Sequence, residues 1–279
     1  MGGLTSSRNG MKESSLNLIS RPKMKSPVMV AGLSGWPDAG GVSSLSVAYL
    51  RDTLNASLIG TIELSSFIDH TQHRPIVLIE DGVIKSIAMP GFEVFWAIAG
   101  QRDLILVKGF EPNSGWERFV AALFELVETF GVDMVVTIGG LLDRIPHTKP
   151  VRVSFLTDSR EIHQRAVSLG LRPSNYQGPA SIHSYIMHEC GKLGLKAVSV
   201  WGHVPSYLNI SNPRVIGAVL EKVGKLAGVD LDLDRLYFEA SLFEGKLENM
   251  MEQDSELRRL VEALEREFDE EERRPDYIT

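Results

Sequence analysis

The chain has little cysteine: Cys190 is the only one among its 279 residues. A single thiol cannot form an intrachain disulfide or a cysteine-rich zinc site, so we expect a reducing, cytoplasmic location. Basic residues are too few for a broad nucleic-acid-binding face, because 29 Lys and Arg stand against 36 Asp and Glu. No apolar run approaches the roughly 20 residues of a membrane helix, and no signal-peptide core precedes Val28. These absences argue against nucleic-acid and membrane partners.

Several motifs of familiar enzyme classes are also absent. The sequence has no G-x-x-x-x-G-K-[ST] phosphate loop, no H-E-x-x-H zinc motif, no G-x-S-x-G nucleophile turn, and no G-x-G-x-x-G after its first apolar run. Asp69, His70 and His73 suggest zinc by their spacing, but no further His or Cys follows at a fixed offset. We therefore expect no metal and no cofactor. Spacing alone cannot select a Ser-His-Asp triad, because triads are defined by geometry.

Apolar residues make up 43% of the chain, enough for a sizeable core. Short apolar runs alternate with stretches in which apolar residues recur every three or four positions, which predicts alternating strands and helices. We expect strands at 28–33, 57–64, 76–79, 83–89, 103–108, 132–138, 151–156 and 195–201, and helices at 42–54, 114–130, 158–169, 180–193 and 212–227. This alternation predicts one α/β domain over residues 28–230 with a mainly parallel mixed sheet.

Local signals mark two of these elements. The dipeptide Asp81-Gly82 between two apolar runs predicts a β-hairpin. Ser114 and Glu117 have the spacing of a capping box, which predicts a helix start at Ser114. Cys190 lies inside a predicted helix, where a cysteine is more typical of an inert core residue than of a nucleophile.

The two ends of the chain differ from the middle. Residues 1–27 are polar and aperiodic, so we expect a disordered leader, whose first six residues fit an N-myristoylation pattern. Residues 231–272 carry two apolar stripes separated by Asp254, a suitable N-cap, and predict a helical hairpin followed by a flexible tail at 273–279. This hairpin should dock on its own domain or on a second copy, and contribute to self-association. The acidic residues expected on its solvent-facing side are Glu262, Glu265, Glu267 and Glu270.

Polar loops follow most of the predicted strands. Because ligands of open α/β sheets bind at the carboxyl ends of the strands, these loops predict a shared cleft. The alternative is that Pro, Gly and Asn only shape turns while His and Tyr lie in water. We expect Asp38 and His147 to face one crevice, since each follows a central strand. The candidate cleft residues are Asp38, Gly40, His73, Arg74, Glu111, His147, Thr148, Tyr176, Gly178, His203, Tyr207 and Asn212.

Seven sequence blocks resemble the signature blocks of the proteasome assembly chaperone family, second-subunit type. In unbroken order they are 35–40 (GWPDAG), 73–75 (HRP), 109–112 (GFEP), 139–142 (GGLL), 145–151 (IPHTKPV), 175–179 (NYQGP) and 200–207 (VWGHVPSY). The resemblance implies a three-layer α/β/α sandwich similar to the phosphorylase/hydrolase-like fold. It also implies assembly into a small homo-oligomer and a binding or assembly role.

The chain departs from the family pattern at two places. Gln177 stands where relatives usually carry Glu in a Tyr-Glu-Gly-Pro block. Archaeal relatives that dock on proteasome rings end in a hydrophobic residue, Tyr and any residue, whereas this chain ends Asp276-Tyr277-Ile278-Thr279. Proteasome subunits and another protein complex therefore both stay open as partners.

Two functions follow. The first is a non-enzymatic, self-associating scaffold or assembly chaperone, favoured by the resemblance and by the missing catalytic motifs. The alternative is a hydrolase, a transferase or a small-ligand-binding protein that uses the loop cleft. Convergence of Asp38, His147, Tyr176 and His203 on one pocket would favour the alternative, and their separation would favour the first.

Overall fold

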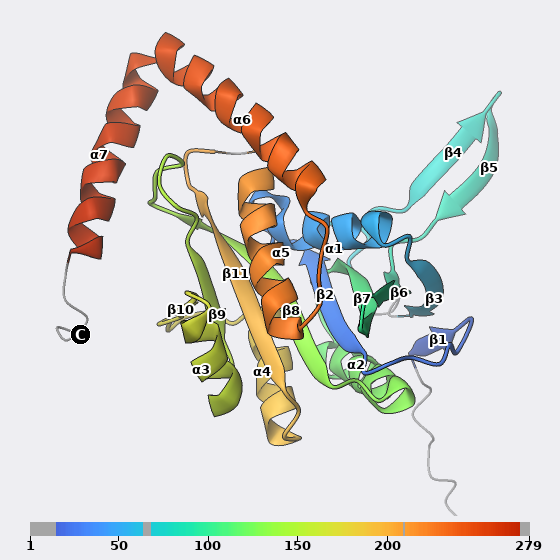
Figure 1. The fold of residues 1–279 in the computed structure, drawn as a ribbon. Helices are drawn as coiled ribbons and strands as arrows, with labels where there is room; N and C mark the ends of the chain where they lie inside the picture. Colours follow the sequence, from blue (N-terminus) through green and yellow to red (C-terminus); the bar gives the residue numbers. More distant parts are fainter. Residues whose placement is uncertain (1–14, 64–67, 209, 274–279) are drawn as a thin grey trace, which may run out of the picture.

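The computed structural model describes residues 15–63, 68–208 and 210–273, which build a nine-stranded sheet with helices on both faces (Figure 1). The strand order is β1-β3-β6-β7-β2-β8-β11-β9-β10. The strands are β1 (Leu16–Leu18), β2 (Val28–Ser34), β3 (Ser57–Ile62), β6 (Phe92–Ala99), β7 (Arg102–Phe110), β8 (Met134–Asp143), β9 (Val153–Leu156), β10 (Arg172–Pro173) and β11 (Ala197–Pro205). The N-myristoylation pattern and residues 274–279 of the expected tail lie outside the described residues.

The middle of the sheet is parallel because its strands are apolar on both faces. β7, β2, β8 and β11 run parallel to one another. Neighbours in β2 that point to opposite faces, such as Val30 and Ala31, are both completely buried. Such burial is typical of a parallel sheet covered by helices on both sides. Antiparallel pairs extend the sheet, β3–β6–β7 on one side and β9–β11 on the other. The predicted mainly parallel mixed sheet is confirmed.

Helices on both faces complete three layers and confirm the predicted fold class. α1 (Val42–Thr53), α3 (Arg160–Ser168) and α5 (Pro213–Ala227) pack on one face, and α2 (Trp116–Phe130) and α4 (Ile182–Lys192) on the other. A short 3-10 turn, η1 (Ala39–Gly41), leads into α1. α1 lies close to β2 because residue 32 is Gly: a Cβ there would lie 2.4 Å from the Ser43 carbonyl oxygen. The Ser43 hydroxyl accepts from the Leu33 N–H at 2.8 Å and donates to the Ile138 carbonyl, joining α1 to two central strands.

The sequence pattern misses three strands: β1, β6 and the two-residue β10. β6 lies at 92–99, where no strand is expected, and pairs antiparallel with β3 and β7. β1 lies within the expected disordered leader, and that expectation is wrong for residues 15–27. Leu16 is buried because the short strand extends the sheet beside β3. β1 depends on pairing with the distant β3, which a local pattern does not reveal. β6 forms a hairpin with the adjacent β7, where Ala99 lies opposite Arg102, and the pattern misses this local pairing as well.

The two predicted helix caps have different outcomes. α7 (Ser255–Glu272) begins after Asp254 as predicted, and the Asp254 carboxylate accepts from the N–H groups of Glu256 and Leu257. α2 begins at Trp116 after Gly115, which has φ 69°, so the predicted N-cap at Ser114 is wrong. Gly tolerates this left-handed conformation without the strain that a Cβ would cause.

Two helices follow the α/β domain, as predicted. α6 (Asp234–Gln253) packs on α5 and buries Leu236 and Leu247. At Asp254 the chain turns, and α7 leads away from α6 past the β9–β10 side of the sheet (Figure 1). The pair therefore docks on its own α/β domain, one of the two expected placements.

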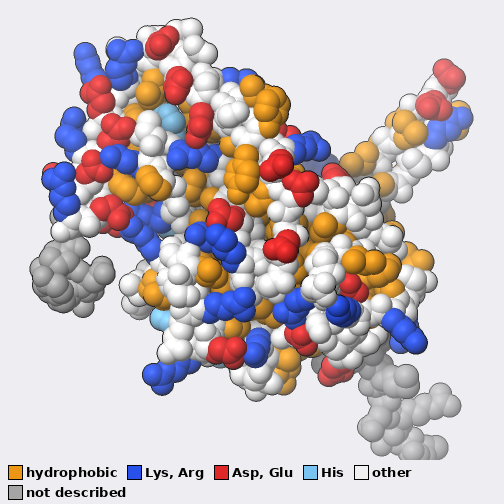
Figure 2. All heavy atoms as spheres, in the orientation of Figure 1, with side chains coloured by type: hydrophobic (Ala, Val, Ile, Leu, Met, Phe, Trp, Pro, Cys, Tyr) orange, Lys and Arg blue, Asp and Glu red, His pale blue; other side chains and the backbone are white. Residues whose placement is uncertain are grey.

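The hairpin predicted from Asp81-Gly82 is confirmed. β4 (Ile76–Glu80) pairs antiparallel with β5 (Val83–Ala88) in a sheet of their own. The hairpin projects from the body of the molecule, and hydrophobic side chains lie along it (Figures 1 and 2). Every residue of both strands is exposed.

Candidate functional site

The loop at residues 144–152, between β8 and β9, carries the Pro-His-Thr-Lys-Pro block. The His147 backbone N–H donates to the Tyr207 hydroxyl at 2.8 Å, and His147 Nδ1 lies 2.6 Å from the same oxygen. Since the oxygen already accepts from the backbone, its own hydrogen is directed to Nδ1. Arg214 of α5 donates to the His147 carbonyl. The centre of the loop is thus fixed to the α/β domain.

Burial determines the charge of this pair. Burial, with a further effect from Arg214, lowers the pKa of His147 below its ordinary value of 6.5. Burial also raises the pKa of Tyr207 to about 12. Both groups are therefore neutral at pH 7, and their contact is a structural hydrogen bond between uncharged side chains.

The acidic side of α7 contacts the outer side of the same loop. Lys149 Nζ lies 2.6 Å from Asp269 Oδ1. Arg152 Nη2 lies 2.8 Å from Glu271 Oε2, and the Arg152 guanidinium lies 5.3 Å from the centroid of the Phe268 ring. Folding thereby brings the basic loop against the acidic side of α7. The paired residues lie 120 and 119 positions apart in the sequence.

Two of the four acids expected to face solvent also contact this loop. Glu265 accepts from the Thr148 hydroxyl, and Glu267 Oε1 lies 3.1 Å from Arg144 Nη2. Glu262 and Glu270 are exposed, as predicted. Glu267 is exposed as well, as predicted, whereas Glu265 is only half-exposed, because the periodicity of one helix does not show which distant groups lie beside it.

Burial decides how strongly each contact holds α7. The Arg144–Glu267 pair is exposed on both sides, so it contributes on the order of 0–1 kcal/mol. The Arg152 side chain is only 11% exposed, and its pairing with Glu271 is screened less by salt. Val261 and Leu264 are the buried apolar residues of this helix. α7 is therefore attached by two buried apolar side chains and by a larger number of polar side chains.

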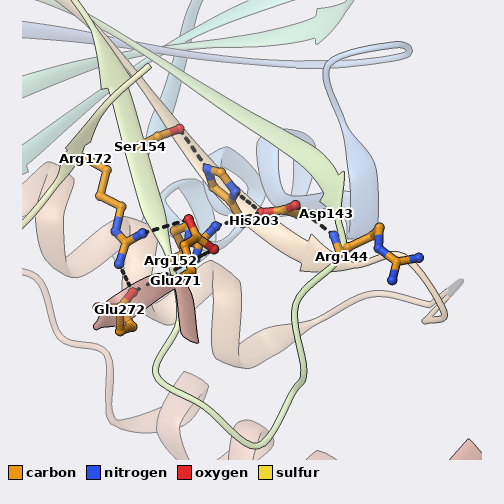
Figure 3. A network of polar contacts seen from close by, with 8 residues as sticks. All are labelled: Asp143, Arg144, Arg152, Ser154, Arg172, His203, Glu271 and Glu272. Atoms are coloured by element: carbon orange, nitrogen blue, oxygen red, sulfur yellow. Dashed lines mark hydrogen bonds and ion pairs between the residues drawn. The ribbon is translucent and has the colours of Figure 1, made fainter. Parts of the chain in front are cut away.

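A chain of three polar side chains joins the ends of β8 and β11 to β9 (Figure 3). His203 Nδ1 lies 2.8 Å from Asp143 Oδ2, and His203 Nε2 lies 2.9 Å from Ser154 Oγ. The hydrogen bond from His203 lowers the pKa of Asp143 below its ordinary value of 3.8. An ionised carboxylate only accepts hydrogen bonds, so Nδ1 carries a hydrogen, and in the neutral imidazole Nε2 then accepts from the Ser154 hydroxyl.

A small cavity lies between this loop, α5 and α6. Three candidate residues line it, His147, His203 and Asn212, together with Phe243 and Leu247 of α6. Its space of about 20 Å³ holds little more than one water molecule. In this conformation the cavity has no room for a substrate of ordinary size.

The expected shared cleft is divided in the structure. Of the four side chains whose convergence would favour an enzyme, only His147 and His203 line this cavity. Asp38 lies at the start of α1, where its carboxylate accepts the backbone N–H groups of Ser43 and Ser44 at 2.7 and 3.0 Å. Its observed role is helix capping.

Several other candidate residues shape loops. Asn212 caps α5 by accepting from the Val215 N–H at 3.2 Å, and its own backbone N–H donates to the Gly40 carbonyl at 3.2 Å. Tyr176 is exposed and its ring covers Gly178, where a Cβ would lie 2.5 Å from the hydroxyl oxygen. These contacts match the alternative in which turn residues have structural roles.

A separate group lies at the end of β7. His73 stacks on Phe110 with ring centroids 3.9 Å apart. Glu111 accepts the Ile182 N–H at 2.8 Å at the start of α4, and burial raises the pKa of Glu111. Arg74 is exposed. None of these three candidate residues lines the cavity beneath the 144–152 loop.

The described residues contain no group of three His, Cys, Asp or Glu side chains placed to hold a metal ion. The Asp69 carboxylate accepts hydrogen bonds from Thr71 and Gln72. Within the same part of the chain, no helix has the length and apolar character needed to cross a bilayer. Cys190 is buried, and burial raises its thiol pKa to about 12, in agreement with the predicted core role.

Sequence reasoning does not single out Ser154, Arg152 or Asp143. Ser154 lies within a strand and belongs to no motif, so only geometry reveals its contact with His203. A signal for the α7 contact does exist: three cations at 144, 149 and 152 match the acidic run at 269–272 in charge.

Family comparison agrees with this architecture. The sequence model of the PAC2 family matches residues 32–251, most of the chain. The chain belongs to the PAC2 family. The matched PAC2 region includes the central sheet and most of α6 and ends before α7. No curated protein sequence matches the chain.

Three solved structures are similar to this PAC2 chain. Rv2714, a Mycobacterium tuberculosis protein of unknown function, is 26% identical, with 92% of both chains covered and a TM-score of 0.83. A PAC2 family protein from Streptomyces avermitilis is 31% identical, with 84% of this chain and 99% of that chain covered and a TM-score of 0.76. The M. tuberculosis proteasome-assembly chaperone homologue Rv2125 is 32% identical, with the same coverage and a TM-score of 0.77.

Reversing the charge of the loop should release α7. In an Arg144→Glu/Lys149→Glu variant, the loop would repel Glu267 and Asp269 where it now attracts them. We expect the amides of α7 to exchange hydrogen at least about tenfold faster, measured by mass spectrometry.

The matched control for this experiment is Lys192→Glu/Lys196→Glu. It makes the same change in net charge, but these lysines pair with Glu189 and Glu161, away from α7. Exchange of α7 should stay unchanged in the control. Equal exchange of α7 in the loop variant and the natural chain would contradict a charge-based attachment.

Asp143 should stabilise the fold in a pH-dependent manner. Its pKa is lowered in the folded chain, mainly by the His203 hydrogen bond. Such a group stabilises the fold above its unfolded pKa, near 3.8, and the contribution is lost as pH falls through the folded pKa. Asp143→Asn should therefore lower the free energy of unfolding at pH 7, and the deficit should shrink below about pH 3.8. Urea denaturation across this range measures both effects.

Glu111→Gln provides a control of opposite sign. Burial raises the folded pKa of Glu111 above its ordinary 4.5, so its contribution is present at low pH and is lost as pH rises through the folded pKa. The stability difference between Glu111→Gln and the natural chain should therefore change with pH in the reverse direction. Parallel pH curves for the two variants would contradict both assignments.

Proposed function

We propose that this chain is a self-associating binding protein of the proteasome-assembly-chaperone type, whose role needs no chemical step. The observation that carries the proposal is its 32% identity to Rv2125, a proteasome-assembly chaperone homologue, over 99% of that chain. The seven signature blocks support the second-subunit type within this family. The lone, buried Cys190 supports a cytoplasmic location.

The β4–β5 hairpin supports self-association. A two-stranded hairpin by itself is marginally stable in water. Eight large apolar side chains of this hairpin and its end are between 46% and 75% exposed, namely Ile76, Val77, Leu78, Ile79, Val83, Ile84, Ile87 and Met89. An extended arm with this composition gains stability when a partner covers it, since burial of apolar surface is favourable.

The size of the arm fits an interface between two copies. A standard interface buries roughly 800 Å² on each partner, and eight side chains exposed to this extent supply apolar surface of that order. In a symmetric assembly every copy places its hairpin on a neighbouring copy and is contacted by the hairpin of a neighbour, so the same contact occurs once for each copy. The partner that this geometry supports first is therefore a second copy of the chain.

The C-terminal helices are the other candidate for self-association. α6 already packs on α5 of its own chain, but Phe238 and Leu242 are 64% and 53% exposed. These side chains offer a smaller apolar surface than the hairpin. The contribution of α6 and α7 to self-association stays a prediction, and the hairpin is the stronger candidate.

Adding charge to the hairpin should break the assembly. We expect Ile79→Lys/Ile84→Lys to reduce the mass of the natural oligomer to that of one chain, because two lysines cannot be buried in an apolar contact without large cost. Multi-angle light scattering measures the mass. Ile98→Lys, at a position 64% exposed on β6, is the control and should keep the oligomer mass. A monomeric natural chain, or an unchanged mass in the hairpin variant, would refute this use of the hairpin.

A proteasome-related role has a direct test. The purified chain should form a complex with separately expressed proteasome core subunits of its own organism, detected by native mass spectrometry as a defined mass. An unrelated α/β protein of similar charge serves as the negative control, to exclude adhesion. Absence of a complex with every core subunit would remove the proteasome as partner while leaving the family and self-association unaffected.

A further inference from the structure

The Ser154–His203–Asp143 chain has the atom order of a hydrolytic triad. The serine oxygen meets Nε2 of the histidine at 2.9 Å, and the carboxylate meets Nδ1 at 2.8 Å (Figure 3). This arrangement orients the imidazole with its acceptor nitrogen toward the hydroxyl, as a general base requires. The three residues come from β9, β11 and β8, so rigid strands hold them in place.

Two nitrogen atoms near this chain are buried donors without an acceptor. Arg152 Nε has no hydrogen-bond partner, and Arg152 lies two residues before Ser154, on the same side of the strand. Trp201 Nε1 also lacks a partner, and Trp201 is the residue directly opposite Ser154 on β11. Trp201 is more than nine-tenths buried, with 8% of its surface exposed. A buried donor without a partner is unfavourable unless a ligand or water accepts its hydrogen.

A purely structural role explains this arrangement less completely. A buried serine hydroxyl needs one acceptor, and His203 supplies it. That role gives no reason for the unpaired Nε–H of Arg152 or the unpaired indole N–H of Trp201. A carbonyl oxygen bound next to Ser154 could accept from such donors, as the oxygen does in acyl-transfer sites.

We infer that Ser154 is an activated nucleophile and that this chain cleaves short acyl esters, an activity separate from its proposed binding role. The acyl group is short because Ser154 is only 5% exposed, which leaves little space beside its hydroxyl. Ser154 is the catalytic nucleophile, His203 is the general base, and Asp143 is a positioning residue that holds the imidazole.

The reaction proceeds through an acyl-serine. Ser154 Oγ forms a bond to the ester carbonyl carbon while its proton moves to His203 Nε2. The bond from that carbon to the alkoxy oxygen then breaks, and the departing alcohol takes the proton from Nε2. Water attacks the acyl-serine, passes a proton to Nε2, and the proton returns to Ser154 Oγ as the acid leaves. The net change is ester plus water to acid plus alcohol.

A small fluorophosphonate, diisopropyl fluorophosphate, tests the nucleophile without knowledge of the natural ester. The Ser154 oxygen would bond to phosphorus, fluoride would leave, and His203 would take the proton. We expect intact mass spectrometry of the full chain to show one phosphoryl adduct, and peptide mapping to place it on Ser154. Ser154→Ala should abolish the adduct, whereas Ser199→Ala, another buried serine with no histidine contact, should keep it.

Asp143→Asn separates an activated serine from an accessible one. It keeps the Ser154 hydroxyl but loses the carboxylate that orients His203, so the labelling rate should fall at least about 100-fold. Ser154→Cys is the second test of the same position: it keeps a nucleophile there and should be alkylated by iodoacetamide. Melting temperatures of all variants show whether each one is folded.

Three results would overturn the inference. They are no adduct on Ser154 under conditions that label trypsin fully, an adduct on a different residue only, or equal labelling rates for Asp143→Asn and the natural chain. Each would make the chain of contacts a structural feature. None would affect the oligomer mass or the proteasome complex, so the proposed binding function is tested independently.

Discussion

The geometry of the candidate site depends on the contacts that the Asp143 carboxylate makes. Asp143 ends β8, accepts from His203 of β11, and lies 3.5 Å from Arg152 at the start of β9. Through Arg152 it is coupled to Glu271 of α7. Loss of this one charge would remove one partner of the largely buried Arg152 and leave the imidazole of His203 unoriented, and a buried group without its partner costs more than the contact itself contributes. β8, β11 and the residue before β9 therefore meet at one carboxylate, and Arg152 links this carboxylate to Glu271 of α7.

The molecule is held together by two kinds of contact of different strength. The sheet, α1 and α5 form a continuous apolar core in which most side chains are fully buried. α7 buries only Val261 and Leu264 and relies on charged contacts for the rest of its attachment. Because charged contacts at the surface are weak and sensitive to salt, α7 should open more readily than the sheet, α1 and α5.

Sequence reasoning finds the elements whose signals are local. The apolar runs of β2 and β8, the Asp81-Gly82 turn and the Asp254 cap are all where the pattern predicts them. It misses β1, which depends on pairing with the distant β3, and also β6 and the two-residue β10, although β6 pairs with the adjacent β7. It also predicts an N-cap at Ser114, whereas the helix begins after Gly115, so a correct spacing is no proof of a cap.

The candidate site was less predictable than the fold, because its contacts join residues far apart in sequence. Loop position identifies His147, His203 and Asn212, which do line one cavity. The same reasoning places Asp38 with them, although its carboxylate caps α1. Ser154 has no motif, since the spacing of a serine, a histidine and an aspartate carries no information about their geometry.

The pairing of the 144–152 loop with α7 also constrains how this sequence can change through evolution. Lys149 and Asp269, or Arg152 and Glu271, lie about 120 residues apart, yet a change of sign at one leaves its partner facing a like charge. A substitution that reverses the charge of one member of a pair is therefore unfavourable unless the other member changes as well. Descendants of this chain should vary at these positions in pairs, so the inheritance of the loop is linked to that of a helix near the other end of the chain.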